Sequence, residues 1–286
     1  DLVDEQPLGA AVDRPERAGR TIILTSGTTG TPKGAARRTP GGIEPLISII
    51  ERIPLHVGDT VLVSAPVFHT WGFAALQLCF GMCATVVLQR RFTPGAAVKA
   101  LESHSCTGMF AVPVMLQRML EQLPPDPSGR DRRGSLRVIA TSGSAYPSGF
   151  TARFMDEYGD VLYNLYGSTE ASWVCIATPA DLRRHPDTAG RPPLGTVVRI
   201  LDDAGAEVAP GQVGRIFCGS DMVFEGYTAG GSKEFVDGMV STGDMGHVVD
   251  GLLFIDGRDD DMVISGGENV YPAEVESLLV AHPAVR

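Results

Sequence analysis

The residues best suited to chemistry in this chain stand together in a glycine-rich segment near its beginning. Residues 25–34 read Thr-Ser-Gly-Thr-Thr-Gly-Thr-Pro-Lys-Gly and follow an apolar run at 21–24 that favours a strand. Glycines let successive backbone N–H groups converge on an anion, and the hydroxyl groups and the lysine add donors and charge. We therefore expect a polyphosphate cradle, with a plain surface loop as the alternative. The residues expected to hold the phosphates are Thr25, Ser26, Gly27, Thr28, Thr29, Gly30 and Lys33.

The spacing of this segment disfavours the phosphate loop of nucleoside triphosphatases. That loop needs a glycine, four spacers and then Gly-Lys-Ser/Thr, whose hydroxyl binds magnesium. Counted from Gly27, Pro32 stands at the second glycine and Gly34 stands at the hydroxyl position. A phosphohydrolase of that class remains an alternative, which would release phosphate without any carboxylic acid.

A second chemical segment, Tyr-Gly-Ser-Thr-Glu at 166–170, follows the strand-like run at 161–165. Ligands bind at strand ends in α/β sheets. An aromatic face could stack on a base, the Thr169 hydroxyl could hold a phosphate oxygen, and Glu170 could bind magnesium. One carboxylate suffices because Mg²⁺ also takes substrate phosphates. A simple Tyr-Gly turn is the alternative.

Two further segments are rich in small residues, and each could equally be a plain turn. They are Ser142, Gly143, Ser144 and Ala145, and Ser241, Thr242, Gly243 and Asp244. Small residues in the first allow close approach of a flat ring. The Asp244 carboxylate can accept two hydroxyl donors at once, as a ribose diol offers.

Taken in order, these segments resemble the motifs of the adenylate-forming (AMP-binding) superfamily. That superfamily comprises acyl-CoA synthetases, adenylation domains of nonribosomal peptide synthesis and beetle luciferases. The resemblance covers most of the chain and includes Gly257-Arg258, which follows Asp244 by fourteen residues. It implies that a small-molecule carboxylic acid attacks ATP to give an acyl-adenylate and pyrophosphate, after which CoA displaces AMP. The implied cofactors are ATP, Mg²⁺ and CoA.

The resemblance also assigns roles to particular residues. Lys33, Thr169 and Glu170 would act on the phosphates, with Glu170 as the metal ligand. Adenine would lie between residues 143–145 and the Tyr166–Gly167 segment, and Asn164 would meet its polar edge. Asp244 and Arg258 would fix the ribose. Arg215 stands where the family has an acidic residue, so we expect a structural salt bridge to be weakened.

Two other places are open to more than one reading. His69, with Trp71 and Gly72, would line the acyl pocket by resemblance, but a histidine among aromatic residues can also be a hydrogen-bonded core residue or a pH-sensitive group. The three adjacent carboxylates at 259–261 could form a solvated turn or a metal site. The resemblance instead implies a domain hinge pivoting at Asp260.

The chain alternates strand-like and helix-like runs up to about residue 189, which predicts an α/β fold with a mostly parallel, doubly covered sheet. Expected strands are 60–64, 83–88, 109–112, 136–140 and 161–165. Expected helices are 43–50, 71–81, 93–104, one from 113 and 150–158. We expect three units, namely 1–189 as a partial adenylation core, 190–257 as a β-rich, barrel-like subdomain, and 258–286 as the hinge and start of an α+β C-terminal domain.

The bulk composition describes an ordinary globular protein. Hydrophobic residues make up 43% and charged residues 20%, and the formal net charge is −10. With no basic block, the sequence disfavours nucleic acid as a partner. The five cysteines contain no Cys-x-x-Cys pair, which favours reduced core thiols in the cytoplasm. The apolar run 73–88 is too short to span a bilayer, and peripheral membrane contact stays open.

The ends and two motifs shape the functional expectation. Asp1 is not methionine, and the helix pattern at 272–280 stops near Arg286, so we expect a chain shortened at both ends that binds nucleotide weakly and does not turn over alone. Residues 267–272 and the neighbourhood of His69 resemble fatty-acyl-CoA synthetases. The alternatives are a fatty-acyl-AMP ligase serving a carrier protein and a nucleotide-binding relative without catalysis.

Overall fold

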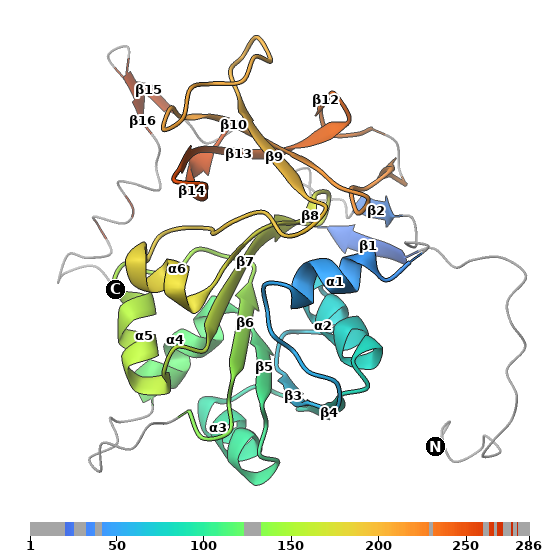
Figure 1. The fold of residues 1–286 in the computed structure, drawn as a ribbon, viewed down its shortest axis with the longest axis vertical. Coiled ribbons are helices and arrows are strands. Elements are labelled where there is room, and N and C mark those ends of the chain that lie inside the picture. Colours follow the sequence, from blue (N-terminus) through green and yellow to red (C-terminus); the bar gives the residue numbers. More distant parts are fainter. Residues whose placement is uncertain are drawn as a thin grey trace, which may run out of the picture.

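A computed structural model describes residues 21–25, 33–37, 42–122, 133–228, 231–259, 263–265 and 268–270, together with 276 and 279. Figure 1 shows an α/β layer at one end of the molecule and an antiparallel β-rich layer at the other. The α/β fold and the β-rich unit were both predicted from the sequence.

The larger sheet of the described residues has six strands in the order β4-β3-β5-β6-β7-β8. Five run parallel, and the last runs antiparallel to its neighbour. They are β3 (Thr60–Val63), β4 (Thr85–Leu88), β5 (Gly108–Ala111), β6 (Val138–Ser142), β7 (Leu162–Ser168) and β8 (Ser172–Ala177). The parallel strands therefore end at one common edge, where the predicted base-binding and metal-binding segments meet.

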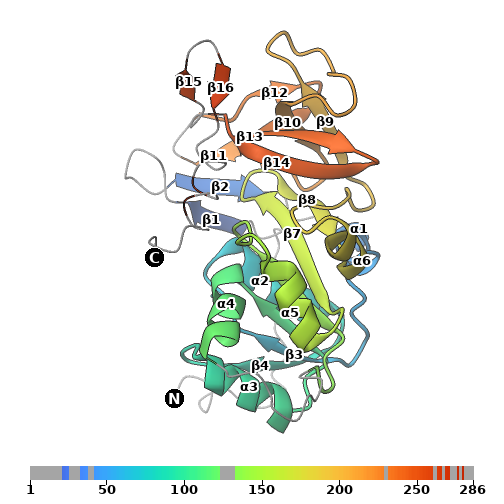
Figure 2. The same cartoon turned by 90° about the vertical axis from the view of Figure 1, so that its left-hand side faces the viewer.

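Helices cover both faces of this sheet, as the apolar, unalternating strands predict. They are α1 (Glu44–Ile50), α2 (Thr70–Gly81), α3 (Pro94–Ser103), α4 (Pro113–Gln122), α5 (Phe150–Tyr158) and α6 (Pro179–Arg184). One buried cluster joins α3, α4 and α5 to the sheet, and another joins α1 and α2 to the opposite face. Figure 2 shows α4 and α5 on the near face and α2 behind them. Thr93 caps α3, since its side chain accepts a hydrogen bond from the Ala96 amide at 3.3 Å.

The second sheet is antiparallel and runs β12-β13-β10-β9, with β14 also paired to β13. Its strands are β9 (Val197–Leu201), β10 (Gly214–Gly219), β12 (Phe235–Val236), β13 (Met239–Val249) and β14 (Leu252–Arg258). The β13–β14 hairpin turns through Asp250 and Gly251, both with positive φ, as a tight two-residue turn requires. Residues 241–244, for which a plain turn was the alternative to a ribose-binding element, lie within β13.

Two small sheets complete the described architecture. One contains β1 (Thr21–Thr25), β2 (Lys33–Arg37) and β11 (Gly226–Tyr227), and the other contains β15 (Val263–Ser265) and β16 (Glu268–Val270). The sequence did not predict β2, β8 or β11. The helix predicted from Pro272 lies outside the described residues except at positions 276 and 279.

Cys83 departs from the expectation that it begins a strand and lies in the core. It lies in the turn between α2 and β4 with φ of 50°, and its side chain is exposed. The other four cysteines are buried, and all five are free thiols. Among the described residues, no helix combines the length and apolar content needed to cross a bilayer.

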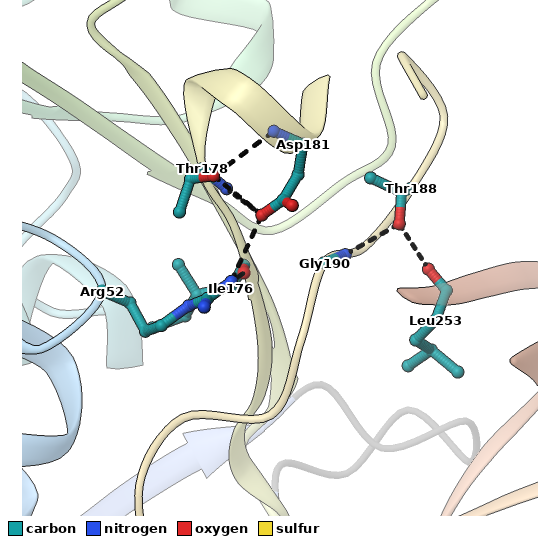
Figure 3. A network of polar contacts seen from close by, with 7 residues as sticks. All are labelled: Arg52, Ile176, Thr178, Asp181, Thr188, Gly190 and Leu253. Atoms are coloured by element: carbon teal, nitrogen blue, oxygen red, sulfur yellow. Dashed lines mark hydrogen bonds and ion pairs between the residues drawn. The ribbon is translucent and has the colours of Figure 1, made fainter. Parts of the chain in front are cut away.

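Polar contacts of Arg52, two residues beyond the end of α1, reach β8 at the edge of the large sheet (Figure 3). The Arg52 guanidinium donates to the Ile176 carbonyl at 3.1 Å and to the Asp181 carboxylate at 3.2 Å. Asp181 also closes a capping box with Thr178 at the start of α6. Arg52 therefore fixes the antiparallel strand β8 from the side.

A short extended segment connects the two large sheets. The Thr188 hydroxyl donates to the Leu253 carbonyl at 2.9 Å, and the Ala189 amide and the Gly190 carbonyl also bond to Leu253. Arg191 exchanges two backbone hydrogen bonds with β8. Only glycine fits at residue 190, because its φ is 90° and a Cβ would lie 2.2 Å from the β8 backbone. Residues 188–191 thus bond to β8 on one side and β14 on the other.

Candidate active site

A cavity of about 380 Å³ opens at the carboxyl ends of β6 and β7. Its wall includes the start of α2 and the ends of both strands. The lining residues that matter below are His69, Thr70, Trp71, Gly143, Thr169 and Trp173. The cavity size falls within the range of roughly 300–1,000 Å³ typical of small-molecule sites.

The start of α2 forms the apolar side of this cavity. The indole N–H of Trp71 donates to the Ala111 carbonyl at 2.9 Å, which fixes the ring at the wall. Gly72 is needed here because a Cβ would lie 2.2 Å from the Pro66 carbonyl oxygen. His69 precedes the helix, is exposed and lines the cavity. It is therefore not a core histidine, and its role at the acyl pocket stays a prediction.

The predicted metal-binding segment turns sharply at the end of β7. Gly167 lies at a bulge, where a Cβ would be 1.9 Å from the Ser172 carbonyl oxygen. The Ser168 hydroxyl accepts hydrogen bonds from the amides of Glu170 and Ala171, at 3.2 and 3.0 Å. These contacts bring Thr169 to the cavity, where its hydroxyl lies 3.2 Å from that of Thr70.

Glu170 receives a hydrogen bond that the sequence did not predict. The Tyr227 hydroxyl donates to its Oε1 at 2.7 Å, across 57 residues of chain. Burial, and then the hydrogen bond to Glu170, raise the pKa of Tyr227 well above its ordinary value, so the phenol stays protonated. The hydroxyl is therefore a permanent donor to this carboxylate at neutral pH.

The predicted ribose-binding residues come together beside Tyr166. The Tyr166 hydroxyl donates to Asp244 Oδ2 at 2.5 Å, and an Arg258 Nη lies 3.4 Å from Asp244 Oδ1. Burial and the neighbouring Asp244 raise the pKa of Tyr166 well above its ordinary value. Burial also raises the pKa of Asp244, although Tyr166 and Arg258 act in the opposite direction. The structure thus joins three residues that are far apart in sequence into one polar group.

The predicted adenine-binding residues lie on β6 and β7 and in the turn after β6. Asn164 pairs with Thr141 across the two strands, and the Thr141 hydroxyl lies 3.3 Å from Asn164 Oδ1. The same hydroxyl contacts that of Tyr146, a residue the sequence did not single out. Gly143 lines the cavity with φ of 111°, while Ser144 and Ala145 are exposed and lie outside its lining.

The phosphate cradle is described only at its two ends. Thr25 and Lys33 are the last backbone pair of the β1–β2 hairpin. Residues 26–32, which include Ser26, Gly27, Thr28, Thr29 and Gly30, lie outside the described residues, as does the predicted hinge Asp260. The Thr228 amide donates to the Gly34 carbonyl at 2.8 Å, which holds β2 against β11.

Arg215 behaves differently from the expectation of a weakened salt bridge. Its guanidinium pairs with Glu234 and, at 3.1 Å, with Asp259. The Asp259 amide in turn donates to the Gly243 carbonyl at 3.0 Å. Arg215 on β10 therefore forms ion pairs of its own, one of them with Asp259, the residue that follows Arg258 at the end of β14.

Within the described residues, no three His, Cys, Asp or Glu side chains gather to hold a metal ion. Mg²⁺ does not require such a cluster, because it takes one or two carboxylates and fills its remaining positions with waters and substrate phosphates. Glu170 fits that role because it is a partly buried carboxylate, fixed by a donor on one oxygen and adjacent to the cavity residue Thr169.

Comparison with known proteins agrees with this geometry. Residues 5–228 match the family of AMP-binding enzymes. The chain is 35% identical over 289 aligned positions to an indoleacetate–CoA ligase of Aromatoleum aromaticum, covering 97% of this chain and 56% of that protein. It is 32% identical to a 2-succinylbenzoate–CoA ligase of Bacillus subtilis, covering 94% and 54%. A feruloyl-CoA synthase of Amycolatopsis is also 32% identical, covering 100% and 58%.

Solved structures show the same relationship. The O-succinylbenzoate coenzyme A synthetase of Bacillus subtilis in complex with AMP matches with a TM-score of 0.82 and 31% identity, over 93% of this chain and 55% of that one. Its complex with ATP and a magnesium ion matches with a TM-score of 0.82 and 32% identity, again over 93% and 55%. The chain spans about half the length of the relatives it matches. With the family match covering most of its residues, the chain belongs to the AMP-binding enzymes.

Proposed function

We propose that this chain carries the nucleotide- and acid-binding core of an acid–CoA ligase that works through an acyl-adenylate. The observation that carries the proposal is the meeting of Tyr166, Asp244 and Arg258 close to a cavity whose edge holds Thr169. An acceptor for a ribose diol, an aromatic ring and a separate apolar cavity are what an acyl-adenylate requires. The relatives named as CoA ligases support the same reaction.

In this proposal each residue contributes by holding a reactant. Lys33 and the preceding segment would hold the outer phosphates of ATP, and Thr169 would hold a phosphate oxygen beside the cavity. Glu170 would hold Mg²⁺, which would neutralise phosphate charge when bound. Because the acid would lie in the cavity with its carboxylate at the Thr169 edge, both reactants would be positioned for in-line attack. Asn164 and residues 143–145 would position the adenine.

We further propose that the acid is an aromatic monocarboxylate. Two aromatic residues, Trp71 and Trp173, line the cavity. The part of the lining that the structure describes includes no lysine or arginine to pair with a second carboxylate. Relatives named for indoleacetate and ferulate support this choice over the fatty acid expected from the sequence. A fatty acid is the alternative substrate.

The test is acid-dependent exchange of pyrophosphate into ATP by the whole protein, with and without CoA. The panel should contain indoleacetate, ferulate, 2-succinylbenzoate and a saturated fatty acid. The proposal expects exchange with the aromatic monocarboxylates and CoA-dependent release of AMP. Exchange with AMP release only on a carrier protein would favour the carrier-dependent ligase, and ATP binding without any exchange would favour a non-catalytic relative.

A further inference from the structure

One segment of the β-rich region contacts both the predicted metal ligand and the strand that follows the phosphate cradle. The Phe224 amide donates to the Glu170 carbonyl at 2.9 Å, and the Tyr227 hydroxyl donates to the Glu170 side chain at 2.7 Å. One residue later, the Thr228 amide binds the Gly34 carbonyl at 2.8 Å. Both the main chain and the side chain of Glu170 are therefore fixed by the segment that also fixes β2.

Packing holds Tyr227 in the required orientation. Its ring meets the buried ring of Phe224 edge-on, with centroids 5.1 Å apart. Its backbone pairs with Ala35, two residues after Lys33 in β2. Strand pairing and ring packing therefore fix the position of the hydroxyl, whereas a side chain without these contacts could rotate. A fixed position suits a group that must orient another residue.

We propose that Tyr227 is a positioning residue for the metal ligand. By occupying Oε1 of Glu170, its hydroxyl fixes the rotation of the carboxylate and leaves Oε2 for a divalent cation bound with the nucleotide phosphates. Because the same segment bonds to β2, it also sets the spacing between the carboxylate and Lys33. This inference rests on the proposed function, in which Glu170 binds the cation. It goes beyond it by assigning a role to a residue outside the recognised motifs.

The test uses Mn²⁺ as the probe, read by electron paramagnetic resonance in the presence of ATP. Tyr227→Phe removes one oxygen and keeps the ring on Phe224. We expect the half-saturating Mn²⁺ concentration to rise about tenfold, the usual effect of losing a hydrogen bond to a metal ligand. Binding of AMP without metal, measured by calorimetry, should not change. Tyr158→Phe is the matched control, because Tyr158 stacks on Phe154 within α5 and lies outside this group.

A double variant separates positioning from loss of structure. In a Glu170→Gln background, Tyr227→Phe should add no further weakening, since the hydroxyl acts through the carboxylate. Additive effects of Tyr227→Phe and Glu170→Gln would overturn the inference.

The wild-type chain distinguishes this inference from the proposed function. Mn²⁺-dependent ATP binding that is the same in wild type and Tyr227→Phe overturns the role of Tyr227 and leaves the proposed function standing. Failure of the wild-type chain to bind ATP with Mn²⁺ overturns both. A Tyr227→Phe effect that Tyr158→Phe reproduces would assign the change to general loosening and overturn the inference alone.

Discussion

Replacing Asp244 by asparagine should separate nucleotide affinity from stability. The carboxylate accepts a hydrogen bond from Tyr166 at 2.5 Å and lies 3.4 Å from Arg258. Asparagine keeps one oxygen for the Tyr166 hydroxyl. The lost attraction to Arg258 is small, because that side chain is 46% exposed and its charge is screened by solvent. The fold should therefore tolerate the change.

The effect on affinity should be much larger. A carboxylate can accept two ribose hydroxyls, whereas the amide has one acceptor and no charge. Losing one hydrogen bond to a charged group costs about 1.5–3 kcal/mol, which is about 10- to 150-fold in Kd. Burial raises the pKa of Asp244, so its charge opposes folding as pH rises from the ordinary value to the raised one. Asp244→Asn should therefore melt no lower than wild type, and its relative stability should increase across that pH window.

The assay is calorimetry with AMP, accompanied by thermal melting. Asp256→Asn is the matched control, since Asp256 is a hydrogen-bonded carboxylate on β14 whose oxygen lies 2.7 Å from His247 Nδ1. It should leave the Kd for AMP unchanged. With 2′,3′-dideoxy-AMP, wild type and Asp244→Asn should bind equally, because the ligand no longer offers a diol. Wild-type affinity of Asp244→Asn for AMP, or an equal penalty with the dideoxy ligand, would refute the assignment.

Three other variants test stability and substrate choice. Burial acts to raise the pKa of Asp59, but hydrogen bonds from a backbone amide and from Arg137 outweigh it, so the pKa is lowered. Asp59→Asn should therefore reduce the free energy of unfolding by about 2 kcal/mol above pH 4, and by less as pH falls through the lowered pKa. A difference in urea unfolding that does not depend on pH would contradict this. Gly167→Ala places a Cβ 1.9 Å from a β8 carbonyl oxygen and should lower the free energy of unfolding by about 3 kcal/mol. Gly95→Ala, where a Cβ meets open space, should raise it by about 0.5 kcal/mol. Equal urea midpoints for the two variants would contradict this prediction. Ala74→Phe narrows the cavity and should raise KM for an aromatic acid at least about tenfold in pyrophosphate exchange, with KM for ATP unchanged; unaltered acid preference would remove the cavity from acid binding.

The sequence predicted the large sheet well because its strands are short apolar runs buried on both faces. In β5, Phe110 packs with one cluster and Met109 with the other, so each run reads as continuous hydrophobic sequence. The strand β2 was missed because it begins inside the glycine-rich motif and carries Lys33 and Arg37. The two-residue strand β11 is too short to show any strand-like sequence pattern. It forms because its backbone pairs with that of β2.

In the candidate site, too, some residues can be recognised from the local sequence and others only from the fold. Motif residues such as Tyr166, Thr169 and Asp244 are recognisable locally, and the structure brings Tyr166 and Asp244 into contact. Their supporting partners are not recognisable, because Tyr227 reaches Glu170 only through tertiary packing. At Arg215 the error is of the opposite kind. The arginine was taken only as the loss of an acidic residue, whereas Glu234 and Asp259 supply carboxylates that pair with an arginine at that position.

The segment 188–191 has a consequence for how the molecule opens. Its backbone bonds to β8 through Arg191 and to β14 through Ala189 and Gly190, so separation from either sheet breaks the connection between the two sheets. Amides at Ile176, Ala189 and Leu253 should therefore exchange with solvent deuterium at one common rate, set by the cooperative unfolding of both sheets. A protease should find no early cleavage point there, and thermal unfolding should carry the large sheet and the β-rich sheet through a single transition.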